Sequence, residues 1–179
     1  MNRMFNISLR PLLLTDSKSL SKHANNRLIW ENLRDKFPFP YTEKDAIQFI
    51  QIVSNNSSIT EFAIDINGNA VGAAGIILKD DIYRGNGEIG YWLGQEYWGK
   101  GVGTWVVGEL VRIAFEELII YRVYAEVFEN NTASARVLEK NGFIKEATLK
   151  QAIIKDGVHQ NVNIFSILKP KPLIKALRN

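Results

Sequence analysis

The dipeptide Asn67-Gly68 constrains the fold of this chain more than any other feature of its sequence. It separates residues 60–66 from residues 70–78, and Asn-Gly supplies the positive φ values that a two-residue hairpin turn requires. The two segments are therefore predicted to pair as antiparallel strands, and a third strand is predicted over residues 87–93. A sheet that begins as an antiparallel meander is not the open parallel sheet built from βαβ units.

Apolar spacing, capping residues and turn residues divide the rest of the chain into helices and strands. The predicted helices cover residues 15–33, opened by Thr15 or Asp16, residues 42–53, opened by Thr42, residues 102–118, and residues 130–141, ended by Gly142. The other predicted strands cover residues 6–10, residues 121–128, and a closing pair, 143–154 and 158–168, around Asp156-Gly157. This order gives an α+β pattern.

Composition excludes several kinds of site. The 179 residues, 46% of them hydrophobic, suit one globular domain. The absence of cysteine excludes thiolate chemistry and disulfides, and the two histidines, His23 and His159, exclude a histidine-rich metal site. The 22 basic and 19 acidic residues are mixed along the chain, so no nucleic-acid partner is indicated. With neither a signal peptide nor an apolar run of membrane-spanning length, we expect a cytoplasmic protein without a membrane partner.

Three glycines, Gly99, Gly101 and Gly103, lie with Lys100 between the third strand and a helix. The first amides of a helix have no intrahelical partner and lie at the positive end of its dipole. Several of them can converge on a phosphate only where side chains do not block its approach. The stretch therefore predicts a phosphate site, and the alternative is a tight turn that lets the helix pack closely on the sheet.

Two nucleotide-binding motifs fail at this stretch. Residues 94–101 follow the P-loop spacing up to the last position, where Gly101 replaces the Ser or Thr that holds magnesium. The dinucleotide fingerprint fails because its third glycine is wrongly spaced here. Neither a nucleoside triphosphatase nor a dinucleotide-binding protein is therefore indicated.

Two linked motifs give the chain a resemblance to a known family. Trp98-Gly99-Lys100-Gly101-Val102-Gly103 resembles the pyrophosphate loop of the GNAT superfamily of acetyl-CoA-dependent N-acetyltransferases, and residues 88–93 resemble the strand before that loop. Asn131-Thr132-Ala133-Ser134, followed by Lys140-Asn141-Gly142-Phe143, resembles a later element of the family. The chain looks most like the RimJ/RimL type, which acetylates N-terminal amines of ribosomal proteins.

The resemblance implies the GNAT fold, an α+β (three-layer α/β) arrangement with a central, mixed and mostly antiparallel sheet flanked by helices. It implies a single domain over residues 1–179, an acetyl-CoA-binding core at about residues 87–143, acetyl-CoA as co-substrate, and no metal. The coenzyme-binding residues that it implies are Tyr91, Trp92, Leu93, Trp98, Gly99, Lys100, Gly101, Val102, Gly103, Thr104, Asn131, Ser134, Arg136 and Lys140. Arg136 and Lys140 would approach the adenosine 3′-phosphate or simply line a surface.

Two positions of these motifs depart from the family pattern. Trp98 replaces a Gln or Arg, as is common in the RimJ/RimL branch. Leu138 stands where many GNAT enzymes have a tyrosine general acid, which rules out tyrosine catalysis at that position. The resemblance implies that Ser134 acts instead, by a hydrogen bond to the coenzyme sulfur, and the alternative is a role in capping the helix after Asn131.

Acyl transfer from a thioester to an amine needs an unprotonated amine, a polarised carbonyl group and a stabilised thiolate. Amides near Trp92 and Leu93 are expected to face the acetyl carbonyl if their strand splays from its neighbour, with Gly94 as the point of departure. Glu126 and Glu88 are the candidates for the base, because a half-buried glutamate can have a raised pKa. Glu126 is preferred, since the resemblance places the glutamate base of ribosomal N-terminal acetyltransferases there. The alternative for each glutamate is an exposed carboxylate on a strand.

The sequence constrains the identity of the acceptor less than that of the coenzyme. Residues 30–41 and the hairpin over residues 151–163, which contains His159, are expected to wall its site in this fold. Asn161 or Asn163 stands where RimJ/RimL-like chains commonly have an aspartate. The sequence predicts direct attack by an amine, most simply a protein N-terminus. A small amine (an aminoglycoside, a polyamine or an amino acid) and a coenzyme-binding module without catalysis are the alternatives, and both a monomer and a homodimer remain open.

Overall fold

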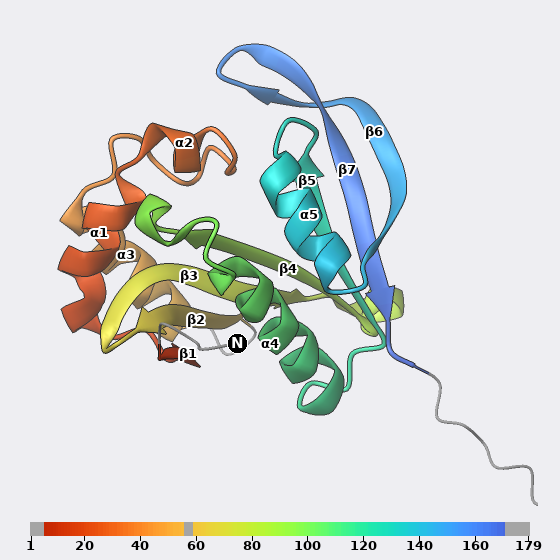
Figure 1. Ribbon diagram of the computed structural model, residues 1–179, viewed down its shortest axis with the longest axis horizontal. Coiled ribbons are helices and arrows are strands. Elements are labelled where there is room, and N and C mark those ends of the chain that lie inside the picture. Colours follow the sequence, from red (N-terminus) through yellow and green to blue (C-terminus); the bar gives the residue numbers. More distant parts are fainter. Residues whose placement is uncertain (1–5, 56–58, 171–179) are drawn as a thin grey trace, which may run out of the picture.

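The computed structural model describes residues 6–55 and 59–170 and places seven strands in one sheet (Figure 1). The strand order is β1-β2-β3-β4-β5-β7-β6, in which β4 and β5 are parallel and the other neighbours are antiparallel. The predicted mixed, mostly antiparallel sheet is confirmed. The strands are β1 Ile7–Arg10, β2 Ile59–Ile66, β3 Asn69–Leu78, β4 Asn86–Leu93, β5 Arg122–Phe128, β6 Ile144–Lys155 and β7 Val158–Leu168.

The helices agree with the predictions except near the N-terminus. They are α1 Ser17–Ala24, α2 Arg27–Trp30, α3 Glu43–Ser54, α4 Val102–Glu116 and α5 Thr132–Lys140, with 3-10 turns η1 Leu14–Asp16, η2 Asp81–Tyr83 and η3 Gln95–Tyr97. The single helix predicted over residues 15–33 is wrong, because the chain breaks at Asn25 and Asn26. The side-chain oxygen of Asn26 accepts the N–H of Leu28 at 2.9 Å, which starts α2 where α1 has ended.

The two predicted hairpin turns and the predicted Thr42 cap are confirmed, whereas neither Thr15 nor Asp16 caps α1 with its side chain. Asn67 and Gly68 have φ values of 53° and 87°, and Asp156 and Gly157 have 52° and 75°, as two tight hairpin turns require. Thr42 opens α3 in a reciprocal capping box with the residue at position 45. Local sequence therefore determines both hairpins.

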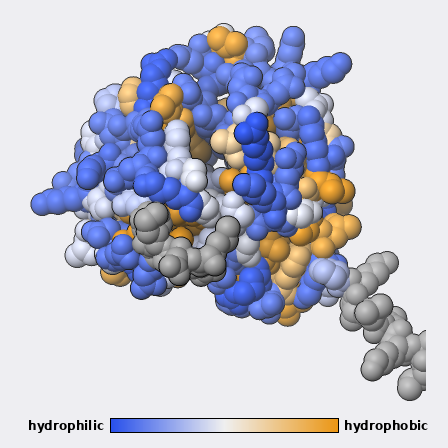
Figure 2. Space-filling view, in the orientation of Figure 1, coloured by the Kyte–Doolittle hydropathy of each residue, from blue (hydrophilic) through white to orange (hydrophobic). Residues whose placement is uncertain are grey.

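Helices cover both faces of the sheet and create two apolar clusters (Figure 1). On one face, α4 buries Val106 and Leu110 against inward residues of β2 to β5. On the other, α1 and α3 bury Leu20 and Ile50 against Ala63 of β2. Because side chains alternate along a strand, the residues of β4 divide between two surfaces of different chemistry. On the outer face shown in Figure 2, hydrophilic side chains predominate.

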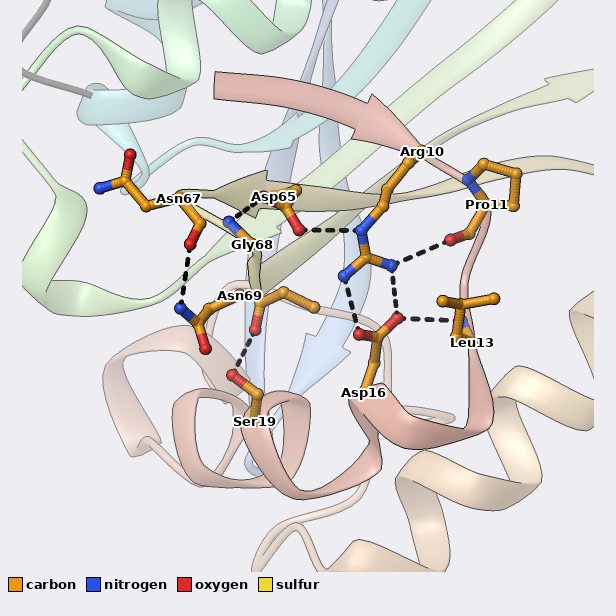
Figure 3. A network of polar contacts seen from close by, with 10 residues as sticks. Arg10, Pro11, Leu13, Asp16, Ser19, Asp65, Asn67, Gly68 and Asn69 are labelled. Carbon is orange, nitrogen blue, oxygen red and sulfur yellow. Dashed lines mark hydrogen bonds and ion pairs between the residues drawn. The ribbon is translucent and has the colours of Figure 1, made fainter. Parts of the chain in front are cut away.

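An ion-pair network fixes the first strand (Figure 3). The guanidinium of Arg10 donates to both carboxylate oxygens of Asp16, at 2.7 and 2.8 Å, and to Asp65 of β2 at 2.8 Å. Burial alone would raise the pKa of Asp16, but hydrogen bonds from Arg10 and from the N–H of Leu13 bring it below its ordinary value. Asp16 thus joins β1 to the start of α1 and does not cap that helix with its side chain.

Candidate active site

Strands β4 and β5 separate in the middle of the sheet. Their last paired residues are Glu88 and Tyr124, whereas β4 stays paired with β3 as far as Leu93. Beyond Tyr124, β5 pairs with β7 to its end. The backbone of β4 after Glu88 therefore has no neighbouring strand on its β5 side, and a gap opens toward the end of β4.

The expected splay is thus present, but the expected departure at Gly94 is wrong. The strands have already parted six residues earlier, and the N–H of Gly94 still bonds to the carbonyl oxygen of Val71 at 2.8 Å. Glycine is required at position 94 for another reason. A Cβ atom there would lie 2.7 Å from Nδ1 of His23, which packs against this turn.

The glycine loop follows β4 and leads into α4. Gly99 and Gly101 have φ values of 70° and 80°, and a Cβ atom at either would have no heavy atom within 4 Å. Both the backbone conformation and the open space therefore fit a turn that an anion approaches. The first helical bond runs from the N–H of Trp105 to the carbonyl oxygen of Gly101, so the preceding amides lie at the free start of α4.

Glycine is needed at position 103 for a different reason than at positions 99 and 101. A Cβ atom at Gly103 would lie 3.3 Å from the hydroxyl oxygen of Tyr91, which approaches α4 from β4. This glycine therefore gives close packing, the alternative reading of the motif. The side chain of Ser134 lies beside the hydroxyl of Tyr91, and burial raises the pKa of the tyrosine.

Helix α5 completes this side of the gap. Asn131 caps it by accepting the N–H of Ser134 at 3.1 Å, so the backbone of Ser134 serves the cap while its hydroxyl meets Tyr91. Leu138 is 1% exposed in the larger apolar cluster. Arg136 and Lys140 are exposed on α5, where no ion pair within the described part of the chain involves either.

The remaining predicted coenzyme residues lie along the same path. The indole N–H of Trp98 donates to the carbonyl oxygen of Leu93 at 2.7 Å, which ties the loop to the strand end. The side chain of Val102 is fully buried, so this residue presents only its backbone. Lys100 is exposed, and Thr104 lies in the first turn of α4. Trp92 points to the opposite face, where its ring meets Phe37.

The two candidate bases also lie on that opposite face. Glu88 is 8% exposed and accepts from Arg34 at 2.5 Å, Lys79 at 2.8 Å and the hydroxyl of Tyr124 at 3.2 Å. Burial would raise the pKa of Glu88, but Lys79, Arg34 and Tyr124 together lower it. The raised pKa expected for a half-buried glutamate is therefore wrong for Glu88.

Glu126 has a more open environment. Its side chain is 40% exposed, and its carboxylate lies 3.3 Å from the same guanidinium of Arg34 that binds Glu88. Because this residue is beyond the last β4–β5 pair, its side chain borders the gap. Arg34 thus links both carboxylates and belongs to the segment expected to wall the acceptor site.

The two segments expected to wall the acceptor site, residues 30–41 and residues 151–163, contact each other. Nζ of Lys155 donates to Asp35 at 2.8 Å and lies 3.7 Å from the centroid of the Trp30 ring, and Arg27 pairs with Asp156 at 2.6 Å. Helix α2 and the segment after it are thereby held against the tip of the β6–β7 hairpin.

The other predicted residues of the β6–β7 hairpin are His159, Asn161 and Asn163. The side chain of His159 is exposed. The side-chain oxygen of Asn161 accepts the N–H of Gln151, and that of Asn163 accepts the Thr148 hydroxyl. The two asparagines thus stabilise the pairing of β6 with β7.

Four residues of this face were not predicted: Arg34, Lys79, Tyr124 and Glu61. Glu61 has a signal in the sequence, since it shares a strand face with Ala63 and Asp65 where apolar residues would be expected. The other three are recognised only through their contacts with Glu88.

Within residues 6–55 and 59–170, no group of three or more His, Asp or Glu side chains is placed to hold a metal ion. None of the helices described is long and apolar enough to cross a membrane.

Comparison with known proteins identifies the family. The family model "Acetyltransferase (GNAT) domain" matches residues 6–144. Probable N-acetyltransferase YjcK of Bacillus subtilis is 30% identical over 92% of this chain and 94% of its own. YoaA, an uncharacterized N-acetyltransferase, and YdaF, a putative ribosomal N-acetyltransferase, both of B. subtilis, are 39% and 33% identical over 47% and 58% of this chain. These two matches span only 48% and 56% of the relatives' own lengths.

Among solved structures, the microcin C7 self-immunity acetyltransferase MccE, in complex with acetyl-CoA and AMP, has a TM-score of 0.80 and 25% identity. The alignment covers 91% of this chain and 92% of that one. A mixed sheet in which β4 and β5 separate, with a glycine turn at the end of β4, thus defines an acyltransferase fold. The chain belongs to the GNAT acetyltransferase family.

Proposed function

We propose that this protein transfers the acetyl group of acetyl-CoA to the N-terminal amine of a protein, of the kind found in ribosomes. The observation that carries the proposal is the open glycine turn at the mouth of the β4–β5 gap. YdaF, whose name gives a ribosomal substrate, and MccE, whose structure holds acetyl-CoA, support the acceptor class and the donor.

The residues present suit a diphosphate. Gly99 and Gly101 leave the approach to the start of α4 free of side chains, and the amides there favour negative charge without a metal. Arg136 and Lys140 are exposed positive charges on α5, which packs against α4, and we assign them to a further phosphate. The unpaired backbone of β4 beyond Glu88 can donate to an extended chain in the gap, as an edge strand does.

The two faces of the gap divide the chemistry. Ser134 and Tyr91 lie on the α4–α5 side, and we assign the Ser134 hydroxyl to the leaving sulfur, with Tyr91 holding that hydroxyl in place. Glu126 lies on the opposite side and is assigned to accept the proton of the attacking amine, directly or through water. A nucleophile entering from one side and a thiolate leaving on the other suit direct attack without a covalent enzyme intermediate.

Glu88 is assigned a positioning role. Three donors saturate its carboxylate and lower its pKa, which makes it a poor proton acceptor. By holding Arg34, it fixes the cation that lies beside Glu126.

Release of free thiol from acetyl-CoA, measured with a panel of acceptors, tests this proposal. The panel contains peptides with a free N-terminus, the same peptides with a blocked N-terminus but free lysines, and small amines. We expect transfer to the free N-terminus only, located by mass spectrometry. Transfer only to small amines would establish the alternative acceptor class, and binding of acetyl-CoA without transfer to any acceptor would refute catalysis.

A further inference from the structure

Glu61 of β2 has a carboxylate without a partner on the acceptor side of the sheet. It shares its strand face with Ala63, which is fully buried under α1 and α3, and with Asp65, which binds Arg10. No hydrogen bond or ion pair joins the carboxylate of Glu61 to the part of the chain that the structure describes. Burial alone raises its pKa to about 7.

The strand register aligns Glu61 with two glycines. Glu61 pairs with Gly75 of β3, which in turn pairs with Gly90 of β4, so the three residues form one row across the sheet. We call them the glycine row. A Cβ atom at Gly75 would lie 2.3 Å from the carboxyl carbon of Glu61, which shows that the glutamate side chain lies over β3.

The glycine row leads from this carboxylate to the gap. Gly90 is exposed, and a Cβ atom there would have no heavy atom within 4 Å, so the space over β4 is open. Gly90 is also the first residue of this face beyond the last β4–β5 pair. With neighbouring strands about 4.8 Å apart, the carboxylate over β3 lies about 7 Å from the middle of the gap.

The other charged groups of this face leave Glu61 unpaired. Arg34 and Lys79 form ion pairs with Glu88, which lies on the same face of β4 two residues before Gly90. Glu126 lies across the gap on β5. None of these groups contributes to the pKa of Glu61. A cation that reached the glycine row would therefore meet a carboxylate that nothing else neutralises.

We propose that Glu61 is a specificity-determining residue that binds a second positively charged group of the acceptor, about 7 Å from the amine that is acetylated. The proposal rests on the proposed function. The second group is an ammonium or guanidinium group, which a basic side chain near a protein N-terminus or the far end of a linear diamine would supply.

Matched acceptors that differ only in the second charge test the proposal. One pair is a peptide with lysine at its first or second position and the same peptide with norleucine there. The other pair is 1,5-diaminopentane and 1-aminopentane. For whichever pair is acetylated, we expect the wild-type KM to be about tenfold lower for the charged member, with kcat changed less than twofold.

The variant Glu61→Gln should remove this preference by raising the KM of the charged member about tenfold. The variant Glu139→Gln, at an exposed glutamate on α5, is the matched control and should keep the preference. In the wild type the ratio of the two KM values should increase as the pH rises from 6 to 8, because Glu61 becomes ionised, and in Glu61→Gln it should stay constant.

A ratio unchanged by Glu61→Gln would overturn the proposal, as would a wild type without preference for the charged member. If Glu61→Gln does not fold, Glu61→Asp, which keeps the charge but shortens its reach, should reduce the preference partway. If no acceptor is acetylated, the proposed function has failed, and calorimetric binding of each pair to the CoA-loaded protein tests Glu61 separately. Equal affinities there would refute the cation site.

Discussion

The half-buried carboxyl group of Glu61 should make the stability of this protein depend on pH in a direction opposite to that of most carboxylates. In the folded protein its pKa is about 7, compared with an ordinary value of 4.5. The folded state therefore binds a proton more tightly than the unfolded state does. The free energy of unfolding should fall as the pH rises through this interval, because ionisation is favoured by unfolding.

The size of the effect follows from the two pKa values. At about 1.4 kcal/mol for each pH unit, the difference corresponds to about 3.5 kcal/mol in full. Between pH 5 and pH 8.5, most of this range is crossed, so we expect a loss of about 2 to 3 kcal/mol from this one group. In a chain of this size, that loss corresponds to a decrease in Tm of roughly 5–10 °C.

Urea denaturation of the wild type and Glu61→Gln at pH 5 and pH 8.5 measures this contribution. Gln cannot ionise, so its stability relative to the wild type should improve by about 2 to 3 kcal/mol between the two pH values. Any constant cost of burying the amide cancels in this comparison, and Glu139→Gln serves as the exposed control. If the difference between wild type and Glu61→Gln is the same at both pH values, the carboxyl group is not buried as described.

Three further substitutions test other parts of the structure. Gly101→Val should weaken acetyl-CoA binding about a hundredfold in calorimetry by filling the open side of the turn, and unchanged affinity would assign the glycine to packing. Glu126→Gln should lower kcat about a hundredfold, most at mildly acidic pH, with unchanged acetyl-CoA affinity; the same result for Glu88→Gln instead would reverse the two roles. Asp16→Asn should cost about 2 kcal/mol in urea denaturation at pH 7. This cost should shrink as the pH falls below 3.8, because the unfolded carboxylate is protonated first, and it should disappear below the lowered pKa of the folded state. A pH-independent cost would contradict the pairing of Asp16 with Arg10.

Much of the fold can be predicted from sequence because its signals are local. Asn67-Gly68 and Asp156-Gly157 adopt the positive φ values that their hairpins need, and Thr42 caps α3 through a bond to a residue three positions away. The prediction of a single helix over residues 15–33 is wrong for a reason that is also local. Asn26 can either lie inside a helix or cap a new one, and apolar spacing that continues through the break does not distinguish the two.

The glycine loop was predicted as one motif, but its glycines have separate causes. Gly101 requires a positive φ and open space, whereas Gly103 makes room for the ring of Tyr91 from another strand. Only the requirement at Gly101 can be inferred from the neighbouring residues in the sequence. The requirement at Gly103 depends on how closely α4 packs against β4, which is a property of the assembled sheet.

The two candidate bases show where sequence reasoning ends. Glu88 and Glu126 are the same residue type on neighbouring strands and the same face, so periodicity cannot separate them. Their environments differ because Arg34, 54 residues before Glu88 and 92 before Glu126, reaches both. Lys79 and Tyr124 then saturate Glu88 alone.

A carboxylate with three donors stabilises the junction of the strands, whereas one that shares a single cation at an open gap retains the capacity to accept a proton. Arg34 should therefore matter to both carboxylates in different ways. Its loss would leave Glu88 with two donors but Glu126 with none from within the described chain. The identity of the base thus depends on a distant loop residue as much as on the glutamate itself.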